Sequence, residues 1–306
     1  MKVFISGLLN IETTVKVRKF PIDYYPIDYP FFGINSSVSG VGYNLAKAFR
    51  TLGDDVNLFS FIGNDTEGKV IFDKLKNDGI NLQNINFGLK NTPVSTVLFD
   101  DEGKRQIYCD LKDIQEQSAD YSNVKGLAES ELFVICNTNF NRELIKKVKD
   151  SGRLTATDVH VLGDIYDDYN SDFMKYSDIL FLSDENLPCP PVEFVKKLNE
   201  VYGNKIIVIG MGNKGALLYD EENGIFQFDA VECENVLNTV GAGDALFSGF
   251  LHFYMNGFSA YDSLVRAEIF ASVKIGFNGA SKGFADEKII EGLVQEKTPL
   301  VSRLEK

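Results

Sequence analysis

The stretch from Asn238 to Leu251 combines a loop of small residues with one carboxylate at the start of an apolar helix. Gly241, Ala242 and Gly243 leave the backbone open to an anion, and the free N–H groups at a helix start attract negative charge. Asp244 would repel a resting phosphate, but it is well placed to accept the proton of a hydroxyl group that attacks one. The sequence therefore predicts a phosphoryl-transfer centre. For the four residues 241–244 alone, a tight turn with an aspartate N-cap is the structural alternative.

The composition limits what the rest of the chain does. With 306 residues, 44% of them hydrophobic, the chain can bury a large core. A net charge of −13 argues against a nucleic-acid partner, because phosphate backbones are bound by clustered Lys and Arg. The four cysteines and two histidines show no zinc-ligand spacing, and no signal peptide or membrane-spanning segment is expected. These features predict a cytoplasmic protein that binds small molecules.

Buried strands alternate with helical segments along most of the chain, which predicts a doubly wound parallel sheet. Polar residues follow several of these strands, and ligands collect where parallel strands end. The expected strands and the polar groups after them are residues 2–9 with Asn10 and Glu12, 132–136 with Asn137, 154–157 with Asp158, and 179–182 with residues 183–186. After the loop at 238–244, two apolar helices are expected at 245–255 and 260–277, followed by a solvated tail after Thr298.

Two segments do not follow the alternation of strands and helices. Residues 13–38 begin as an exposed strand and continue into a segment rich in Pro and Tyr. Residues 92–109 contain two apolar runs around an Asp-Glu-Gly turn, which predicts a β-hairpin. The aromatic surplus of the first segment also fits a surface that binds a partner.

Two glycine-rich stretches resemble nucleotide-binding motifs only superficially. Residues 63–70 nearly spell a Walker A loop, but Val70 stands where the Mg²⁺-binding Ser or Thr should be, so we expect a strand-to-helix turn. Residues 210–215 spell GxGxxG, but the pattern that follows reads as strand, turn and strand instead of a helix. Dinucleotide binding is therefore disfavoured.

The block at 238–251 closely resembles the C-terminal signature of the PfkB (ribokinase-like) carbohydrate kinase family. Residues 39–44 resemble the N-terminal signature of the same family, a GG-x-G-x-N pattern in which Ser39 here replaces the first glycine. The resemblance implies a ribokinase-like α/β fold, with a doubly wound parallel sheet flanked by helices and a small β-sheet lid. It implies a single domain over residues 1–306, with the lid at about 12–38 and 91–112. In several members the lid also forms a homodimer contact.

The resemblance assigns roles to individual residues. Asp244 would be the catalytic base, with Gly241, Ala242 and Gly243 as the anion hole. The other assignments are substrate binding by Glu12, Gly40, Gly42, Asn44 and Asn137, nucleotide binding by Ser183, Gly212, Lys214, Gly215 and Asn278, and metal binding by Asn186 and Asn238. The chain departs from the family pattern at four places: Glu12 replaces an Asp, Ser39 a Gly, Asn238 an acidic residue, and residues 183–186 an N-x-x-E motif.

The expected activity is transfer of the ATP γ-phosphoryl group to a hydroxyl group of a sugar, with Mg²⁺ on the phosphates. The family also suggests K⁺, although Asn238 lacks the usual charge. A phosphorylated sugar should require basic residues near the lid, for which the candidates are Arg18, Lys19, Lys104 and Arg105. An unphosphorylated sugar therefore ranks first, and a nucleoside or pseudouridine is the alternative. A non-catalytic sugar or nucleotide sensor and an NAD-dependent oxidoreductase are the rivals outside the kinases.

Overall fold

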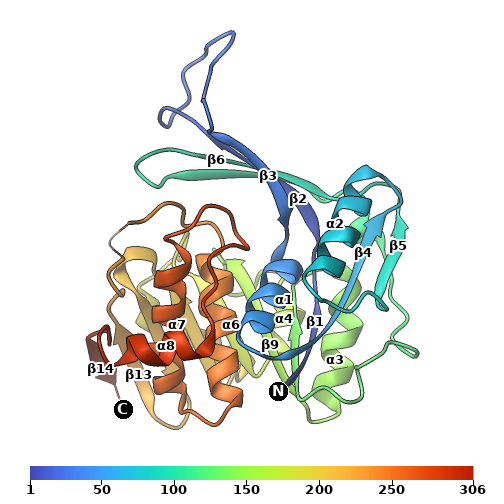
Figure 1. The fold of residues 1–306 in the computed structure, drawn as a ribbon. Coiled ribbons are helices and arrows are strands. Elements are labelled where there is room, and N and C mark those ends of the chain that lie inside the picture. Colours follow the sequence, from blue (N-terminus) through green and yellow to red (C-terminus); the bar gives the residue numbers. More distant parts are fainter. Residues whose placement is uncertain (234, 306) are drawn as a thin grey trace.

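The structure is a computed structural model that describes residues 1–233 and 235–305. Its centre is a large, mostly parallel sheet with helices on both faces (Figure 1). The seven strands from β11 to β5 run parallel, and β12, β13 and β14 extend one edge in antiparallel fashion. In spatial order the strands are β14 (Val301–Glu305), β13 (Gly224–Phe228), β12 (Ala216–Asp220), β11 (Ile206–Gly210), β10 (Ile179–Ser183), β9 (Leu154–Val161), β8 (Leu132–Ile135), β1 (Lys2–Ser6), β4 (Asp55–Gly63) and β5 (Ile85–Leu89). The predicted α/β class is confirmed.

Each face of this sheet has its own apolar core, because successive side chains of a strand point to opposite faces. In β1, Val3 and Ile5 pack into one core and Phe4 into the other. The first core is covered by α1 (Val41–Thr51), α2 (Thr66–Asn77), α6 (Ala242–Met255), α7 (Ala260–Lys274) and α8 (Glu287–Val294), and the second by α3 (Arg142–Asp150), α4 (Ser171–Lys175) and α5 (Pro191–Tyr202). Short 3₁₀ turns lie at η1 (Ile114–Glu116), η2 (Asn139–Asn141) and η3 (Gly212–Lys214). No helix in the described ranges is long and apolar enough to cross a bilayer.

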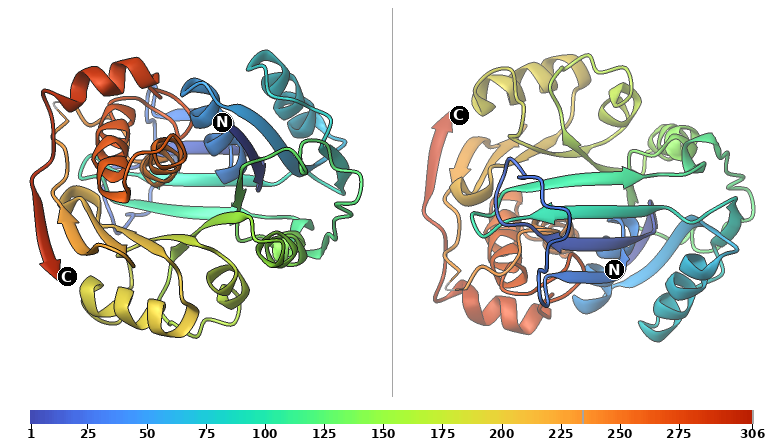
Figure 2. Two further views of the ribbon diagram at one scale, coloured as in Figure 1. Left: turned by 90° about the horizontal axis from the view of Figure 1, so that it is seen from below. Right: turned by 90° about the horizontal axis from the view of Figure 1, so that it is seen from above.

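A second, small sheet lies above the edge where the parallel strands end (Figures 1 and 2). Its strands are, in spatial order, β3 (Ile34–Ser39), β2 (Asn10–Lys16), β6 (Val94–Phe99) and β7 (Arg105–Asp110). Because β6 and β7 pair antiparallel around a short turn, the predicted hairpin is confirmed. Between β2 and β3, residues 17–33 form a protruding loop, called the arm below, that rises from the rest of the molecule (Figure 1).

The stretch that resembles a Walker A loop is a structural turn between β4 and α2. The Asp65 carboxylate accepts hydrogen bonds from the Gly68 N–H at 2.8 Å and from the Thr92 N–H at 2.7 Å. It thereby caps α2 and ties this turn to the start of the small sheet. The interpretation of residues 63–70 as a strand-to-helix turn is confirmed.

Three expected boundaries were wrong. The first strand ends at Ser6 and not at Leu9, because the Leu8 carbonyl accepts a hydrogen bond from the Gly42 N–H at 2.9 Å. Asn10 and Glu12 therefore begin β2 of the small sheet. Strand β9 continues past Asp158 to Val161. The tail after Thr298 is not simply a solvated end, because β14 pairs with β13, whose edge offers backbone groups for pairing.

Candidate active site

Asp244 lies in the first turn of α6, half-buried, and is bound by a residue of α1. The Asn44 Nδ2 donates a hydrogen bond of 2.7 Å to the Asp244 Oδ2. Burial raises the pKa of the Asp244 carboxyl, while the Asn44 amide and the charge of His160 oppose that shift. The two residues that the sequence placed in different motifs, 200 positions apart, therefore meet in one site.

A polar network continues from Asn44 into the small sheet. The buried Ser39 hydroxyl donates to the Asn44 Oδ1 at 3.4 Å, and the same side chain lowers the pKa of Glu12. Glu12 is only 8% exposed, and burial together with the nearby Asp244 charge raises the pKa of its carboxyl. Two buried acceptors, the Glu12 Oε1 and the Asn10 Oδ1, have no hydrogen-bond partner among the described residues. Since buried acceptors normally have donors, this pair marks a place where the hydroxyl groups of a ligand would complete the site.

The loop before α6 is shaped by a glycine that no other residue could replace without strain. Gly241 has φ +81°, and a Cβ there would come within 2.4 Å of the Ala280 carbonyl oxygen. Gly243 differs, because a Cβ there would have no neighbouring heavy atom within 4 Å. The Ala242 N–H donates to the Thr239 carbonyl at 3.1 Å, whereas no bond from the N–H groups of Gly243 or Asp244 is found in the described chain. The N–H groups of Gly243 and Asp244 at the start of α6 are therefore unpaired among the described residues and lie next to open space.

Lys274, at the end of α7, places a positive charge behind this loop. The side chain is fully buried, and its Nζ donates to the Val240 carbonyl oxygen. Burial lowers the pKa of Lys274 to about 8, although the carboxylates of Asp244 and Glu12 act in the opposite direction. The sequence did not reveal this residue, because the same helix also carries Asp262, Arg266 and Glu268 and nothing in the pattern sets Lys274 apart from them.

A second group that the sequence did not reveal is the pair formed by Asp158 and His160 in β9. The His160 Nδ1 lies 3.4 Å from the Asp158 Oδ2, and His160 has φ +62°. Burial lowers the pKa of His160, but the charge of Asp158, its hydrogen bond with His160 and the charge of Asp244 together raise that pKa to about 9. The protonated imidazole in turn favours the ionised form of Asp244. Only the strand-end position of Asp158 hinted at this pair.

The residues expected to hold a nucleotide lie at the ends of neighbouring strands. Ser183 closes β10, and the Lys214 Nζ in η3 lies 3.7 Å from the Asp184 Oδ2, so these two loops meet. Lys214 is largely exposed, and Asn186 and Asn278 are exposed in loops. Gly212 and Gly215 both have positive φ, and β12 with β13 follows them as an antiparallel pair. The expected strand, turn and strand after Gly215 is confirmed, which argues against a dinucleotide fold at this loop.

Several expected site residues are engaged in the fold itself. A Cβ at Gly40 or Gly42 would clash with the backbone of residues 7–9, so packing alone requires both glycines. The Asn137 side chain donates to the Asn170 Oδ1 at 3.0 Å. The Asn238 Oδ1 accepts from the Val240 N–H at 2.8 Å and so fixes the loop before Gly241.

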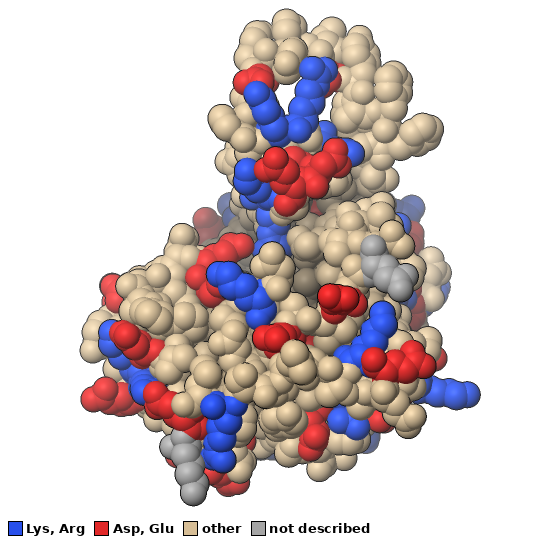
Figure 3. Space-filling model, turned by 90° about the vertical axis from the view of Figure 1, so that its left-hand side faces the viewer, with Lys and Arg blue, Asp and Glu red and all other residues tan. Residues whose placement is uncertain are grey.

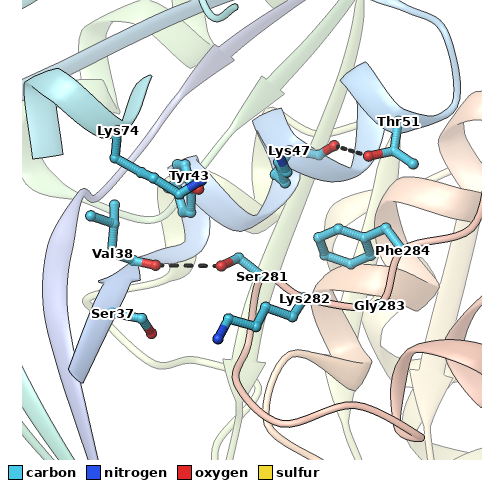
Figure 4. Close-up of a pocket in the computed structure, with 10 residues that line it drawn as sticks. All are labelled: Ser37, Val38, Tyr43, Lys47, Thr51, Lys74, Ser281, Lys282, Gly283 and Phe284. Carbon is cyan, nitrogen blue, oxygen red and sulfur yellow. Dashed lines mark hydrogen bonds between the residues drawn. The ribbon is translucent and has the colours of Figure 1, made fainter. Parts of the chain in front are cut away.

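A pocket of about 300 Å³ lies next to this site but is not part of it (Figure 4). It is lined by residues of α1, the end of β3 and residues 281–284, and neither Asp244 nor Glu12 reaches it. Lys47 and Lys74 extend from α1 and α2, and both bind the Asp78 carboxylate, at 2.7 and 2.8 Å. One carboxylate is therefore shared by two ammonium groups and compensates only one of their two charges.

Comparisons with known proteins agree with this fold. Residues 2–287 match the sequence profile described as pfkB family carbohydrate kinase. A 5-dehydro-2-deoxygluconokinase of Clostridium beijerinckii is 22% identical over 92% of this chain and 93% of that protein. A microbiome-derived acarbose kinase shares the fold with a TM-score of 0.85 at 23% identity, covering 96% of this chain and 99% of its own. Arabidopsis thaliana ribokinase, solved with ribose and ATP, has a TM-score of 0.78 at 18% identity, with 96% and 98% covered.

The pair of Asp158 and His160 predicts an unusual histidine titration. Because the pKa of His160 is raised from 6.5 to about 9, the pair stabilises the fold below pH 6.5, and this contribution is lost as the pH rises through about 9. In Asp158→Asn burial is opposed only by the charge of Asp244, so the pKa of His160 should fall below that of the wild type. Proton NMR of the two histidines measures this, with His160→Gln for assignment and the exposed Asp168→Asn as control. A pKa unchanged in Asp158→Asn would contradict the pairing.

Proposed function

The chain belongs to the pfkB family of carbohydrate kinases and is a sugar or nucleoside kinase, and on that premise we propose an ATP-dependent kinase of an unphosphorylated sugar with Asp244 as its general base. The observation that carries the proposal is the Asp244 carboxylate, held by Asn44 at the rim of an open helix start. A base, a set of amide donors and buried acceptors for hydroxyl groups lie together there. These are the parts that phosphoryl transfer to an alcohol requires.

In the proposed reaction Asp244 accepts the proton of the attacking hydroxyl group. Asn44 holds the carboxylate in place, and the charge of His160 opposes the rise of its pKa on burial. The N–H groups of the loop donate to the phosphoryl oxygens, on which negative charge is concentrated. The Gly243 and Asp244 amides are the strongest candidates, because the Ala242 amide is engaged with Thr239. Glu12 and Asn10 receive hydroxyl groups of the acceptor at their unpartnered oxygens.

The donor set near β10 suits a magnesium ion that arrives with the nucleotide. The described residues contain no group of three or more His, Cys, Asp or Glu side chains that could hold a metal. Mg²⁺ commonly binds through one or two carboxylates plus substrate phosphates and keeps several waters. Asp184 and Asn186 supply oxygens of this kind, and Lys214 beside Asp184 would meet the phosphates. When bound, Mg²⁺ would neutralise charge on the phosphates. Use of ATP fits a cytoplasmic location.

An unphosphorylated acceptor is favoured by the ion pairs of the small sheet and its arm. Arg18 binds Asp28 at 2.7 Å, Lys19 binds Asp23 at 2.8 Å, and Lys104 binds Glu102 at 2.8 Å. Arg105 pairs with Glu185, in the loop after β10, at 3.8 Å, which links the small sheet to the strand ends beneath it. All four candidate phosphate ligands are thus already paired with acids. The small sheet acts as a lid that excludes water during transfer.

The arm and the outer strand β7 offer an apolar surface that suits a homodimer. Tyr24, Phe31 and Phe32 are 88%, 85% and 102% exposed, and Ile107 and Tyr108 of β7 are more than half exposed. The far end of the arm is almost free of charged residues in Figure 3. Large exposed apolar patches mark interaction surfaces. We propose that two lids pair through them.

The first test combines acceptor screening with a variant of the base. ATP consumption against pentoses, hexoses and nucleosides should show turnover with a sugar. With that acceptor, Asp244→Asn should lower kcat by at least about 10²-fold, the low end of general-base contributions. The exposed Asp73→Asn serves as control. Near wild-type turnover in Asp244→Asn would remove its role, and turnover with nucleosides alone would change the acceptor class.

A substitution at Gly243 tests phosphate binding without disturbing the fold. Because a Cβ there meets no protein atom, Gly243→Ala should keep or raise the thermal stability, as alanine does in helices. The added methyl group would nevertheless occupy the space in front of the amides, so kcat/KM for ATP should fall. Gly292→Ala in α8 also meets open space and should keep full activity. Equal activity of both variants would exclude phosphate binding at Gly243.

The lid contact predicts a dimer in solution. Light scattering should give a mass of about twice 34.2 kDa for the wild type. Phe31→Ser combined with Phe32→Ser should give a monomer, whereas Tyr166→Ser, which alters an exposed aromatic outside the lid, should not. A monomeric wild type at micromolar concentration would refute the lid dimer.

A further inference from the structure

We propose that the ammonium group of Lys274 is a built-in substitute for a monovalent metal cation, which orients the glycine loop so that activity does not depend on K⁺. The inference rests on the proposed kinase function and concerns the same site. Lys274 acts on the loop through the Val240 carbonyl, so it is a positioning residue.

Burying the charged side chain of Lys274 costs free energy, so its surroundings must compensate for the lost hydration. A buried ammonium group loses the hydration that it has in water, and proteins keep such a group only where oxygen atoms and opposite charges surround it. Here the side chain is 0% exposed, its Nζ binds the Val240 carbonyl, and the carboxylates of Asp244 and Glu12 favour its charged form. Arg105 of the small sheet acts against it. The arrangement is that of a bound cation, with carbonyl and carboxylate oxygens nearby.

The contact fixes the direction of a peptide group in the loop. Val240 is held on both sides, since its N–H donates to the Asn238 Oδ1 at 2.8 Å and its carbonyl accepts from Lys274. In a trans peptide the C=O and the following N–H point in opposite directions. With the Val240 carbonyl turned toward Lys274, the Gly241 N–H is turned away from it. The ammonium thus keeps a carbonyl dipole from pointing where phosphate oxygens would bind.

The residues present do not fit a potassium ion in the same place. The position where the resemblance expected an acidic ligand holds Asn238, which is uncharged and whose Oδ1 is occupied by the Val240 N–H. The Val240 carbonyl is bound by the ammonium. A second unit positive charge beside Lys274 would be repelled by the ammonium group, because like charges in a protein interior are screened less than in water. The loop therefore has one neighbouring positive charge, which is the ammonium group of Lys274 and not a bound metal ion.

The wild-type enzyme gives the first test and needs no variant. Turnover and the midpoint of thermal unfolding should be the same in potassium, sodium and tetramethylammonium buffers of equal ionic strength. Severalfold activation by K⁺, or a K⁺-dependent rise in the unfolding midpoint, would overturn the proposal. If no acceptor supports turnover, the proposed function fails, but the ion dependence of unfolding still tests the cation site.

Variants of Lys274 give the second test. Lys274→Ala should lower kcat by at least about 10-fold, less than the loss of a direct oxyanion donor, because the residue acts through the loop. Potassium, ammonium or methylammonium should restore part of the activity and raise the unfolding midpoint of this variant only. Lys274→Met fills the space without a charge, so it should be impaired and not rescued. The exposed Lys282→Ala is the matched control. A fully active Lys274→Ala in sodium buffer, or a folded one that no cation rescues, would contradict the inference.

Discussion

The hydrogen bond between Asn44 and Asp244 is the interaction on which the site depends. It joins the starts of α1 and α6, two helices from opposite ends of the chain, at 2.7 Å. Through Asn44 the carboxylate is connected to Ser39 and so to Glu12 in the small sheet. One donor therefore sets the orientation of the Asp244 carboxylate, the proposed base, opposes the rise of its pKa on burial, and connects it to the region where hydroxyl groups would bind.

A chain with a net charge of −13 must concentrate positive potential locally to bind phosphates. The groups near Asp244 that supply such potential are the backbone N–H groups at the start of α6, the protonated His160 and Lys274 behind the loop. The charges of His160 and Lys274 lower the pKa of Asp244 and so oppose the effect of its burial. In the proposed site, the charges that would attract an anion therefore also favour the ionised form of the proposed base.

The small sheet has two roles that use different residues. Its inner side carries Glu12, Asn10 and Ser39, and Arg105 contacts Glu185 in the loop after β10. Its arm and outer strand carry aromatic residues away from the body. The charged residues of the arm pair with each other, Arg18 with Asp28 and Lys19 with Asp23.

The sequence by itself determined the local parts: the alternation of strands and helices, the β6–β7 hairpin, the glycine loop and Asp244, because these depend on patterns within a few residues. It placed Asn10 and Glu12 after the first strand, missed the pairing of β14, and gave no role to Ser39, His160 or Lys274. Only the tertiary structure decided these points. Strand pairing, burial and pKa depend on contacts between residues far apart in the chain, and a buried lysine beside a carbonyl cannot be distinguished by sequence pattern from an exposed one.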